Sequence, residues 1–177
     1  MTTLNGSTTD IPKDPEEGID LKAKGESNIT IGLPNADEAK DAQRLSDGTV
    51  TYPATDGSAN AVIPTNDGVQ VLTTIANNDA PTRYDYNVSV PEGGSVEKLD
   101  EGYAQIIDST GKTAFYISLP WAKDANGSAV PTHFEVEGTK LIQVVDHDSK
   151  SFKYPVVADP RFYYSWGIYT IKFNSTE

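Results

Sequence analysis

The imidazoles of His133 and His147 are the side chains best suited to acid–base chemistry at neutral pH. A Ser-His-Asp hydrolase holds one imidazole between a carboxylate and a hydroxyl nucleophile. His147 lies between Asp146 and Asp148, but adjacent residues of a strand point to opposite faces, so sequence adjacency cannot build a relay. No G-x-S-x-G nucleophile motif accompanies them. We therefore expect His147 in a solvated hairpin turn, His133 as an exposed strand residue, and no enzymatic activity.

A second candidate for chemistry is an oxygen-rich loop with the sequence DANGS. Its Asp124, Asn126 and Ser128 offer oxygen ligands at alternating positions, and Glu135 follows where a calcium-binding loop would place a bidentate carboxylate. Ala129, however, occupies the position that requires glycine in such a loop. A plain Asn-Gly turn is the favoured interpretation. Calcium held by Asp124, Asn126 and Ser128 is the alternative, and it is the one cofactor that the sequence suggests.

Aromatic side chains are the candidates for holding a partner. Trp121 could stack on a carbohydrate, because an indole offers a flat apolar face with one donor edge. A buried tryptophan that follows a strand is the commoner arrangement, and both interpretations stay open. A second apolar group lies near the end of the chain, and we expect it to contact a protein partner or the chain's own downstream C-terminal segment. This group consists of Trp166, Ile168, Tyr169, Ile171 and Phe173.

The peptide bond between Asp159 and Pro160 is a candidate processing site, since Asp-Pro bonds are chemically labile in acid. Cleavage at this bond would release a C-terminal segment. The alternative is that Pro160 ends the last strand of a module and turns the chain, because proline cannot donate to a strand ladder.

Composition narrows the classes of partner. The 14 Lys and Arg residues against 26 Asp and Glu residues give a net charge of -12, which repels phosphate backbones and anionic lipid headgroups. We therefore expect no nucleic acid partner. We also expect no membrane insertion, because no stretch approaches the roughly 20 apolar residues of a membrane helix. Cysteine is absent from the sequence, which removes disulfides and thiolate metal sites.

The elements that position these residues are predicted to be strands. Tyr84, Tyr86, Val88 and Val90 alternate with polar residues, as the two-residue period of a half-buried strand requires. The same alternation recurs between turn residues in the segments 69–75, 115–119, 134–136 and 152–156. This pattern predicts an all-β, antiparallel β-sandwich of immunoglobulin-like or jelly-roll-like type. Helix-forming residues between positions 34 and 45 predict one short helix near 35–45.

The chain divides into three regions on this pattern. Residues 1–28 are polar and too poor in apolar side chains to offset the entropy of ordering them, so we expect a flexible leader. Residues 29–160 are expected to form the β-sandwich module. Residues 161–177 begin with an apolar strand whose two faces both need cover, and we expect them to lead to a downstream segment.

A series of segments within the expected module is recognisable. The segments are IGLP at 31–34, GTVTY at 48–52, DGVQVLTTI at 67–75, APTRYDYNVSVPEG at 80–93, ISLPWAKDANGSAVPTHFEVEG at 117–138, and LIQVVDH with YPVVADP within 141–160. This series resembles a β-rich module of secreted and wall-associated proteins of Gram-positive, chiefly actinobacterial, bacteria. The closing YPVVADP is also similar to the end of modules that precede DNRLRE-type or YD-repeat regions of polymorphic-toxin proteins. The resemblance implies a β-sandwich displayed outside the cell, and it supplies no catalytic residue.

These features predict a non-enzymatic extracellular or cell-surface module with a structural, presenting or partner-binding role in a secreted bacterial protein. The expected partner is a protein or the chain's own downstream segment, and cell-wall carbohydrate is the other candidate. The alternative function is masking or delivery of a C-terminal toxin or bacteriocin-like segment, released near Asp159-Pro160.

Overall fold

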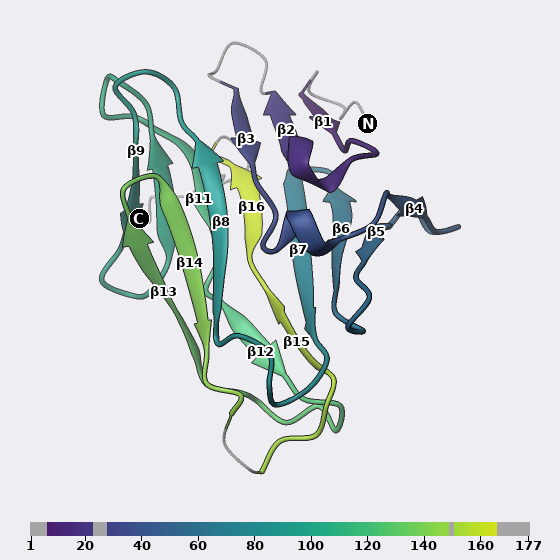
Figure 1. The fold of residues 1–177 in the computed structure, drawn as a ribbon. Coiled ribbons are helices and arrows are strands. Elements are labelled where there is room, and N and C mark those ends of the chain that lie inside the picture. Colours follow the sequence, from purple (N-terminus) through teal and green to yellow (C-terminus); the bar gives the residue numbers. More distant parts are fainter. Residues whose placement is uncertain (1–6, 23–27, 149–150, 166–177) are drawn as a thin grey trace, which may run out of the picture.

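Two antiparallel sheets packed together make up the fold (Figure 1), which confirms the predicted all-β sandwich. The computed structural model describes residues 7–22, 28–148 and 151–165. Every strand pair within these residues is antiparallel. Neighbouring strands along the chain mostly pair with each other, which is the arrangement that short strands joined by turns predict.

The smaller sheet has six strands in the order β1-β2-β3-β8-β14-β13. Their bounds are Thr8–Asp10 (β1), Ile19–Lys22 (β2), Ile29–Ile31 (β3), Arg83–Ser89 (β8), Lys140–Val145 (β14) and Thr132–Glu137 (β13). Half of this sheet therefore comes from the beginning of the chain.

The larger sheet has ten strands, eight of which follow the order β4-β5-β6-β7-β16-β11-β10-β9. Their bounds are Gln43–Arg44 (β4), Val50–Pro53 (β5), Ala59–Thr65 (β6), Gly68–Ile75 (β7), Arg161–Tyr164 (β16), Thr113–Ile117 (β11), Ala104–Ile107 (β10) and Ser95–Lys98 (β9). The other two are Trp121–Lys123 (β12) and Val156–Asp159 (β15). Strand β7 pairs with β16 at its start and with β15 at its end, and β15 also pairs with β12. Figure 1 shows β15 and β16 following one another along β7.

The core lies between the two sheets, because every second side chain of a strand points toward the other sheet. Tyr84, Tyr86 and Val88 are buried, as the alternation in the sequence predicts. The Tyr86 ring centroid lies 6.3 Å from that of Phe162 in the other sheet. The Tyr86 hydroxyl lies 3.0 Å from Thr73 Oγ1, also in the other sheet. Aromatic packing and a buried hydrogen bond therefore join the two sheets.

Part of the region expected to be a flexible leader belongs to the smaller sheet. Strand β1 pairs with β2, and β2 pairs with β3. Ile19 and Leu21 are fully buried, and the Tyr52 hydroxyl donates a hydrogen bond of 2.6 Å to the Pro12 carbonyl. The leader prediction is therefore wrong over residues 8–22. The polar composition of residues 1–28 suggested a flexible segment. A short strand, however, needs apolar side chains only at the alternate positions that face the core.

The short helix predicted near 35–45 is reduced to the 3-10 helix at Ala36–Glu38, and the segment continues into strand β4. The backbone N–H of Lys40 bonds to the Pro53 carbonyl, so a partner distant in sequence replaces the helical ladder. The small side chains of Ala36, Ala39 and Ala42 pack against the core, whereas Leu45 is 47% exposed, so the segment buries little apolar surface with which to hold a longer helix. No helix in the described part of the chain is long and apolar enough to cross a membrane. The two named 3-10 turns are η1 (Pro15–Glu17) and η2 (Ala36–Glu38).

The sandwich extends past position 160, where we expected the module to end. Strand β16 lies between β7 and β11, and its Phe162 and Tyr164 are fully buried. Gly68 permits this insertion, because a Cβ at that position would lie 2.0 Å from the carbonyl oxygen of Phe162. The last described strand is therefore a central strand of the larger sheet.

Candidate binding face of the larger sheet

The outward face of the larger sheet carries aromatic side chains where a solvated sheet face usually carries polar ones. Because Phe162 and Tyr164 of β16 face the core, Arg161 and Tyr163 face outward. The same alternation turns Tyr116 of β11 outward. Tyr116 and Tyr163 are register partners, and their rings stack with centroids 5.9 Å apart and planes at 26°. This pair gives the face a flat aromatic surface.

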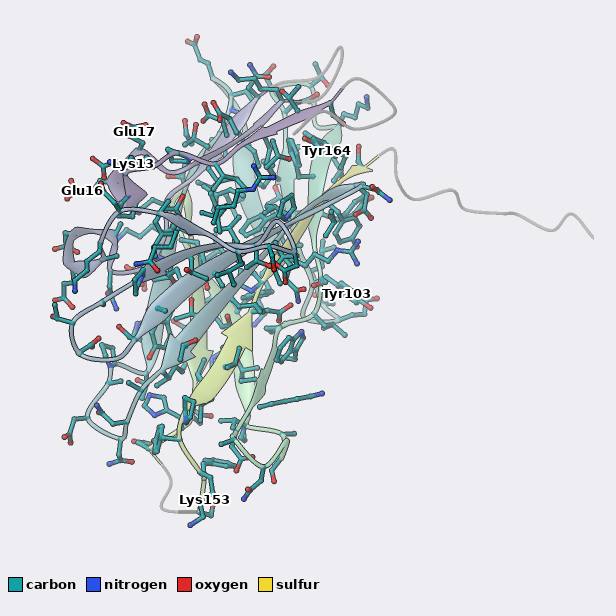
Figure 2. All side chains as sticks on the ribbon, turned by 90° about the vertical axis from the view of Figure 1, so that its right-hand side faces the viewer. Lys13, Glu16, Glu17, Tyr103, Lys153 and Tyr164 are labelled. Carbon is teal, nitrogen blue, oxygen red and sulfur yellow. The ribbon has the colours of Figure 1, made fainter. Side chains whose placement is uncertain are left out.

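An open pocket of about 480 Å³ lies on the same face. Two loop side chains form part of its wall: Tyr103 precedes β10 and is 37% exposed, and Leu119 follows β11 and is 45% exposed. Figure 2 shows Tyr103 on the outside of the molecule, on the margin away from Lys13 and Glu16. We call this hollow the outer-face pocket. Its lining includes Gln70, Tyr103, Leu119, Trp121, Asp159 and Arg161.

Asp159 lines the outer-face pocket although it is only 1% exposed. Its Oδ1 accepts a hydrogen bond of 3.1 Å from the backbone N–H of Trp121, and its Oδ2 accepts one of 3.0 Å from Gln70 Nε2. Burial raises the pKa of the Asp159 carboxyl group above its ordinary value, although these hydrogen bonds act in the opposite sense. The carboxylate thus fixes the positions of Trp121 and Gln70.

Arg161 lies beside this carboxylate and is held by Asp67. Its Nη2 lies 2.7 and 2.8 Å from the two carboxylate oxygens of Asp67, and its guanidinium carbon lies 5.7 Å from the Tyr163 ring centroid. Burial by itself would raise the pKa of Asp67, but the hydrogen bonds from Arg161 and Thr65 outweigh burial and hold the pKa below its usual value. The positive charge of Arg161 is therefore already paired.

Trp121, a candidate stacking platform on sequence grounds, lies in the outer-face pocket. It opens β12, pairs in register with Asp159, and is partly buried. The ammonium nitrogen of Lys123 lies 5.7 Å from the centroid of the indole ring, within cation–π distance. The structure thus brings the indole together with a buried carboxylate, an amide and a second aromatic ring.

Sequence reasoning missed Gln70, Tyr103 and Arg161. The strand alternation does contain a signal for Gln70, since Val69 and Val71 on either side of it are buried. Tyr103 lies in a loop, where no periodicity marks it. Arg161 reaches the pocket only because β16 inserts beside β7, and this pairing joins segments that are far apart in the sequence.

The DANGS loop uses Asp124 to build a turn. Asp124 Oδ1 accepts hydrogen bonds of 2.9 and 2.8 Å from the backbone N–H groups of Asn126 and Ser128, and Oδ2 accepts one of 3.1 Å from that of Lys153. Burial by itself would raise the pKa of Asp124, but these bonds outweigh it and lower the pKa. The three residues meet through N–H donors, so they do not form a set of converging oxygen ligands. In the part of the chain that the structure describes, no group of three or more His, Cys, Asp or Glu side chains is placed to hold a metal ion.

His147 is fully buried, which corrects the solvated turn expected from the sequence. Its Nε2 lies 2.9 Å from the Pro81 carbonyl oxygen, and its Nδ1 lies 2.9 Å from the Tyr154 hydroxyl. That hydroxyl also donates a hydrogen bond of 2.7 Å to the His147 carbonyl. Burial raises the pKa of the Tyr154 phenol, which is the opposite of what a nucleophile needs. The histidine therefore ties two loops together.

The Asp159-Pro160 bond lies inside the larger sheet. Both residues are buried, Asp159 pairs with Trp121, and the Pro160 carbonyl accepts a hydrogen bond of 2.9 Å from the backbone N–H of Val71. Strand β15 ends at Asp159, as the interpretation of Pro160 as a strand terminator predicts. Solvent or a protease would reach this bond only after β15 and β16 separate from β7.

The apolar group expected to contact a partner near the end of the chain lies outside the described residues. Its members are Trp166, Ile168, Tyr169, Ile171 and Phe173. Their role stays a prediction, and the binding face described above depends on none of them.

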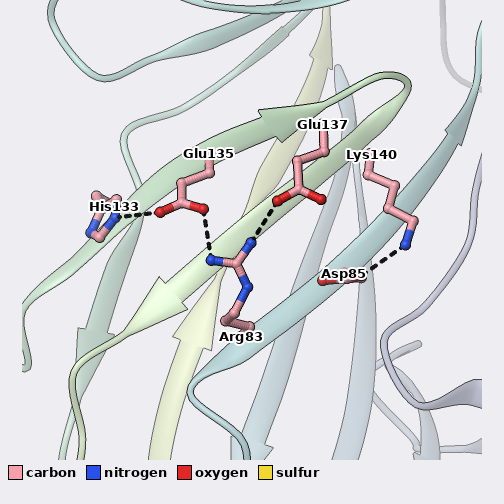
Figure 3. Close-up of polar contacts among 6 residues, drawn as sticks. All are labelled: Arg83, Asp85, His133, Glu135, Glu137 and Lys140. Atoms are coloured by element: carbon pink, nitrogen blue, oxygen red, sulfur yellow. Dashed lines mark hydrogen bonds and ion pairs between the residues drawn. The ribbon is translucent and has the colours of Figure 1, made fainter.

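The outward face of the smaller sheet carries ion pairs (Figure 3). Arg83 of β8 reaches across β14 to β13, where its Nη1 lies 2.7 Å from Glu135 Oε2 and its Nη2 lies 2.9 Å from Glu137 Oε1. His133 is an exposed strand residue, as expected, and its Nε2 lies 3.4 Å from Glu135 Oε1. Lys140 Nζ lies 3.0 Å from Asp85 Oδ2. These exposed pairs contribute little stability.

No family model, curated protein or solved structure matches the chain. The resemblance to modules of secreted Gram-positive proteins therefore stays a prediction. A fold of this kind hosts many functions, so the function has to be argued from the site.

Proposed function

We propose that this chain is a non-enzymatic binding module, an extracellular β-sandwich of a secreted bacterial protein that holds a partner on the outward face of its larger sheet. The observation that carries the proposal is the outer-face pocket, in which Trp121 and Tyr103 lie beside the amide of Gln70 and the carboxylate of Asp159. Binding sites in proteins are concave and combine apolar surface with a few fixed polar groups. The outer-face pocket has both properties.

The chemistry of the pocket favours binding over catalysis. Asp159 is the only carboxylate among the described residues that line it, whereas hydrolysis of a glycosidic bond uses a pair. Both oxygens of Asp159 are already engaged, by Trp121 and Gln70. His147 is fully buried beside a phenol whose pKa is raised, so it supports no acid–base relay. These arrangements fit a surface that holds a ligand without transforming it.

The extracellular and bacterial parts of the proposal are supported by the resemblance of residues 29–160 to modules of secreted, wall-associated proteins. The net charge of -12 is compatible with this setting and disfavours nucleic acid and anionic membranes as partners. The alternative, delivery of a C-terminal segment released near Asp159-Pro160, gains no support from the fold. Cleavage there would leave β16 inside the sheet, held between β7 and β11.

Co-sedimentation with purified cell walls of a Gram-positive bacterium tests the proposal. We expect the full chain to sediment with the walls, and the Trp121→Ala variant to remain in the supernatant because the indole wall of the pocket is gone. A matched pair controls for loss of exposed apolar surface. Leu119 lines the pocket and is 45% exposed, whereas Leu45 is 47% exposed and does not line it.

The Leu119→Ala variant is therefore expected to sediment less than the unsubstituted chain, and Leu45→Ala to sediment equally. Circular dichroism of each variant verifies that the fold is retained. Equal losses from the two leucine variants, or a folded chain that ignores the walls, would contradict the proposal.

A further inference from the structure

We propose that the outer-face pocket binds a neutral polysaccharide of β-linked, gluco-configured pyranose rings, one of which stacks on Trp121. This inference rests on the proposed function and names the ligand class of the same site. Three properties of the pocket lead to it: the position of the indole, the fixed polar groups around it, and the balance of charge.

The indole of Trp121 supplies the apolar contact. A gluco-configured β-pyranose carries its substituents equatorially, so each face of the ring presents only axial C–H bonds. Such a face matches a flat indole in size and in polarity. The backbone of Trp121 is fixed by its register with Asp159 and by the 3.1 Å bond from its N–H to Asp159 Oδ1. The backbone from which the indole projects is therefore already ordered before a ring stacks on it.

Fixed hydrogen-bonding groups surround the indole. Gln70 donates through Nε2 to Asp159, which leaves its amide oxygen on the opposite side of the group. Sugar hydroxyls both donate and accept, and planar amide or guanidinium groups can bond two adjacent equatorial hydroxyls. The planar amide of Gln70 and the planar guanidinium of Arg161 line the pocket, and Ser118 adds a hydroxyl. A polyol is therefore a better match to the lining than a purely apolar ligand.

The charges at the pocket favour a neutral ligand over an anionic one. Arg161 is the only cation among the described lining residues, and it is already paired with Asp67 at 2.7 Å. Asp159 adds a carboxylate to the lining, and the chain as a whole carries a net charge of -12. Inside the outer-face pocket, a uronic acid or a phosphate would meet Asp159 and no unpaired cation among the described lining residues. Two ammonium groups lie nearby, that of Lys123, 5.7 Å from the indole centroid, and that of Lys98 in a neighbouring hollow, but neither residue lines the outer-face pocket.

A second hollow adjoins the outer-face pocket and gives room for more than one ring. The two hollows share Leu119, and the second is lined also by Lys98, Glu101, Pro120 and Thr132. A chain of rings that passes over Leu119 would contact both hollows. We therefore expect a hexasaccharide to bind more tightly than a single sugar.

An extended peptide fits the same surface less well. Peptides commonly bind by adding a strand to a free sheet edge. Strands β7 and β16 beneath the pocket are paired on both sides, so neither offers free backbone groups. A protein ligand is thus one of the outcomes that the experiment below must detect.

Tryptophan fluorescence of the full chain tests the stacking. The sequence holds two tryptophans, so Trp166→Phe leaves Trp121 as the only indole, and Trp121→Phe leaves Trp166. Both chains are titrated with cellohexaose, with chitohexaose, and with β-1,4-linked hexaglucuronate, which keeps the linkage and ring configuration and adds the negative charges. We expect a saturable emission change only in the chain that retains Trp121, and only with the two neutral hexasaccharides.

Titration calorimetry with cellohexaose and chitohexaose then measures the affinity of each variant. We expect Trp121→Ala and Gln70→Ala to weaken binding by roughly tenfold each, and Leu45→Ala to leave it unchanged. Should Trp121→Ala fail to fold, Tyr103→Ala provides a second test, because Tyr103 is 37% exposed and its loss leaves the core intact. Tyr103→Ala is expected to weaken binding by several-fold.

Several outcomes would overturn the ligand class. These are a folded chain that binds neither neutral hexasaccharide at millimolar concentration, β-1,4-linked hexaglucuronate binding as tightly as cellohexaose, or an emission change confined to the chain that retains Trp166. If the chain sediments with cell walls but ignores the hexasaccharides, or if protease treatment of the walls abolishes sedimentation, the polysaccharide is wrong and the proposed function stands. If the chain neither sediments with cell walls nor binds the hexasaccharides, both the ligand class and the proposed function are wrong.

Discussion

The carboxyl group of Asp159 links the two side chains that give the outer-face pocket its character. It is 1% exposed, and burial raises its pKa in the folded protein above the ordinary value of 3.8. The folded protein therefore binds this proton more tightly than the unfolded chain does. By linkage, the contribution of Asp159 to stability falls as the pH rises from 3.8 through the raised folded pKa, and is constant above it.

Asp159→Asn should remove this dependence while it keeps an oxygen for the N–H of Trp121. We expect the free energy of unfolding of the variant to rise, relative to that of the unsubstituted protein, as the pH increases through that window. The rise should amount to about 1.4 kcal/mol for each pH unit that separates the folded and unfolded pKa values. Urea unfolding followed by circular dichroism between about pH 3 and pH 8 measures the difference.

Asp67→Asn is the matched control, because the pKa of Asp67 is shifted in the opposite direction. A depressed folded pKa contributes stability that is present above the ordinary value of 3.8 and is lost as the pH falls through the folded pKa. This variant should therefore be less stable than the unsubstituted protein at neutral pH, and the difference should vanish in acid. Parallel pH profiles for the two variants would contradict the assignment of Asp159 as a buried, destabilised carboxylate.

The pairing of β7 with β16 places the pocket's residues side by side, and it depends on Gly68. A Cβ at this position would lie 2.0 Å from Phe162 O and 2.7 Å from Tyr163 Cα, both of them backbone atoms. Gly68→Ala would force β16 to shift and would disturb the packing of Phe162 on Tyr86. We expect a loss of roughly 3 kcal/mol in the free energy of unfolding, measured by urea denaturation.

Gly111→Ala separates this steric effect from the general cost of replacing a glycine. Its φ of 83° disfavours alanine, but no atom lies within 4 Å of the added Cβ. The expected loss is about 1–2 kcal/mol, from backbone conformation alone. A Gly68→Ala variant no less stable than Gly111→Ala would mean that β7 and β16 are not packed as described.

The sequence predicts which side chains of a strand face the core, but it does not predict which strands pair with each other. Alternation placed Tyr84, Tyr86 and Val88 in the core because side-chain direction is a local property of the backbone. Helix propensity predicted too long a helix near 35–45, because alanines bury little apolar surface and the N–H of Lys40 bonds to Pro53, a partner outside the segment. Partner choice depends on contacts between distant segments, so the insertion of β16 between β7 and β11 left no local signal.

The candidate site was predictable to the same limited extent. Trp121 could be singled out because its residue type has few roles on a surface. Alternation marks Gln70 only as an outward-facing strand residue between two buried valines. Tyr103 and Arg161 carry no such signal, because Tyr103 lies in a loop and Arg161 reaches the pocket only once β16 pairs with β7. The interpretation of His147 failed for a related reason, since its burial comes from Pro81 and Tyr154, which approach it from other parts of the chain.

The whole sandwich includes the strands near the beginning of the chain, and their removal should cost much of its stability. Ile19 and Leu21 are fully buried, and burying two such side chains contributes roughly 3–6 kcal/mol against a total of about 5–15 kcal/mol for a domain. A chain of residues 29–177 would also lose the partners that Pro12 and Thr8 provide for Tyr52 and Tyr164. We expect its melting temperature to fall by roughly 10–20 °C in differential scanning calorimetry.

Two substitutions in the full chain refine the comparison. Leu21→Ala should lower the free energy of unfolding by roughly 2–5 kcal/mol, because the removed side chain faces the core. Lys22→Ala should change it little, because Lys22 is exposed on the other phase of β2. A chain of residues 29–177 that melts at the temperature of the full chain would show instead that β3 can close the smaller sheet alone, with β1 and β2 as dispensable additions to its edge.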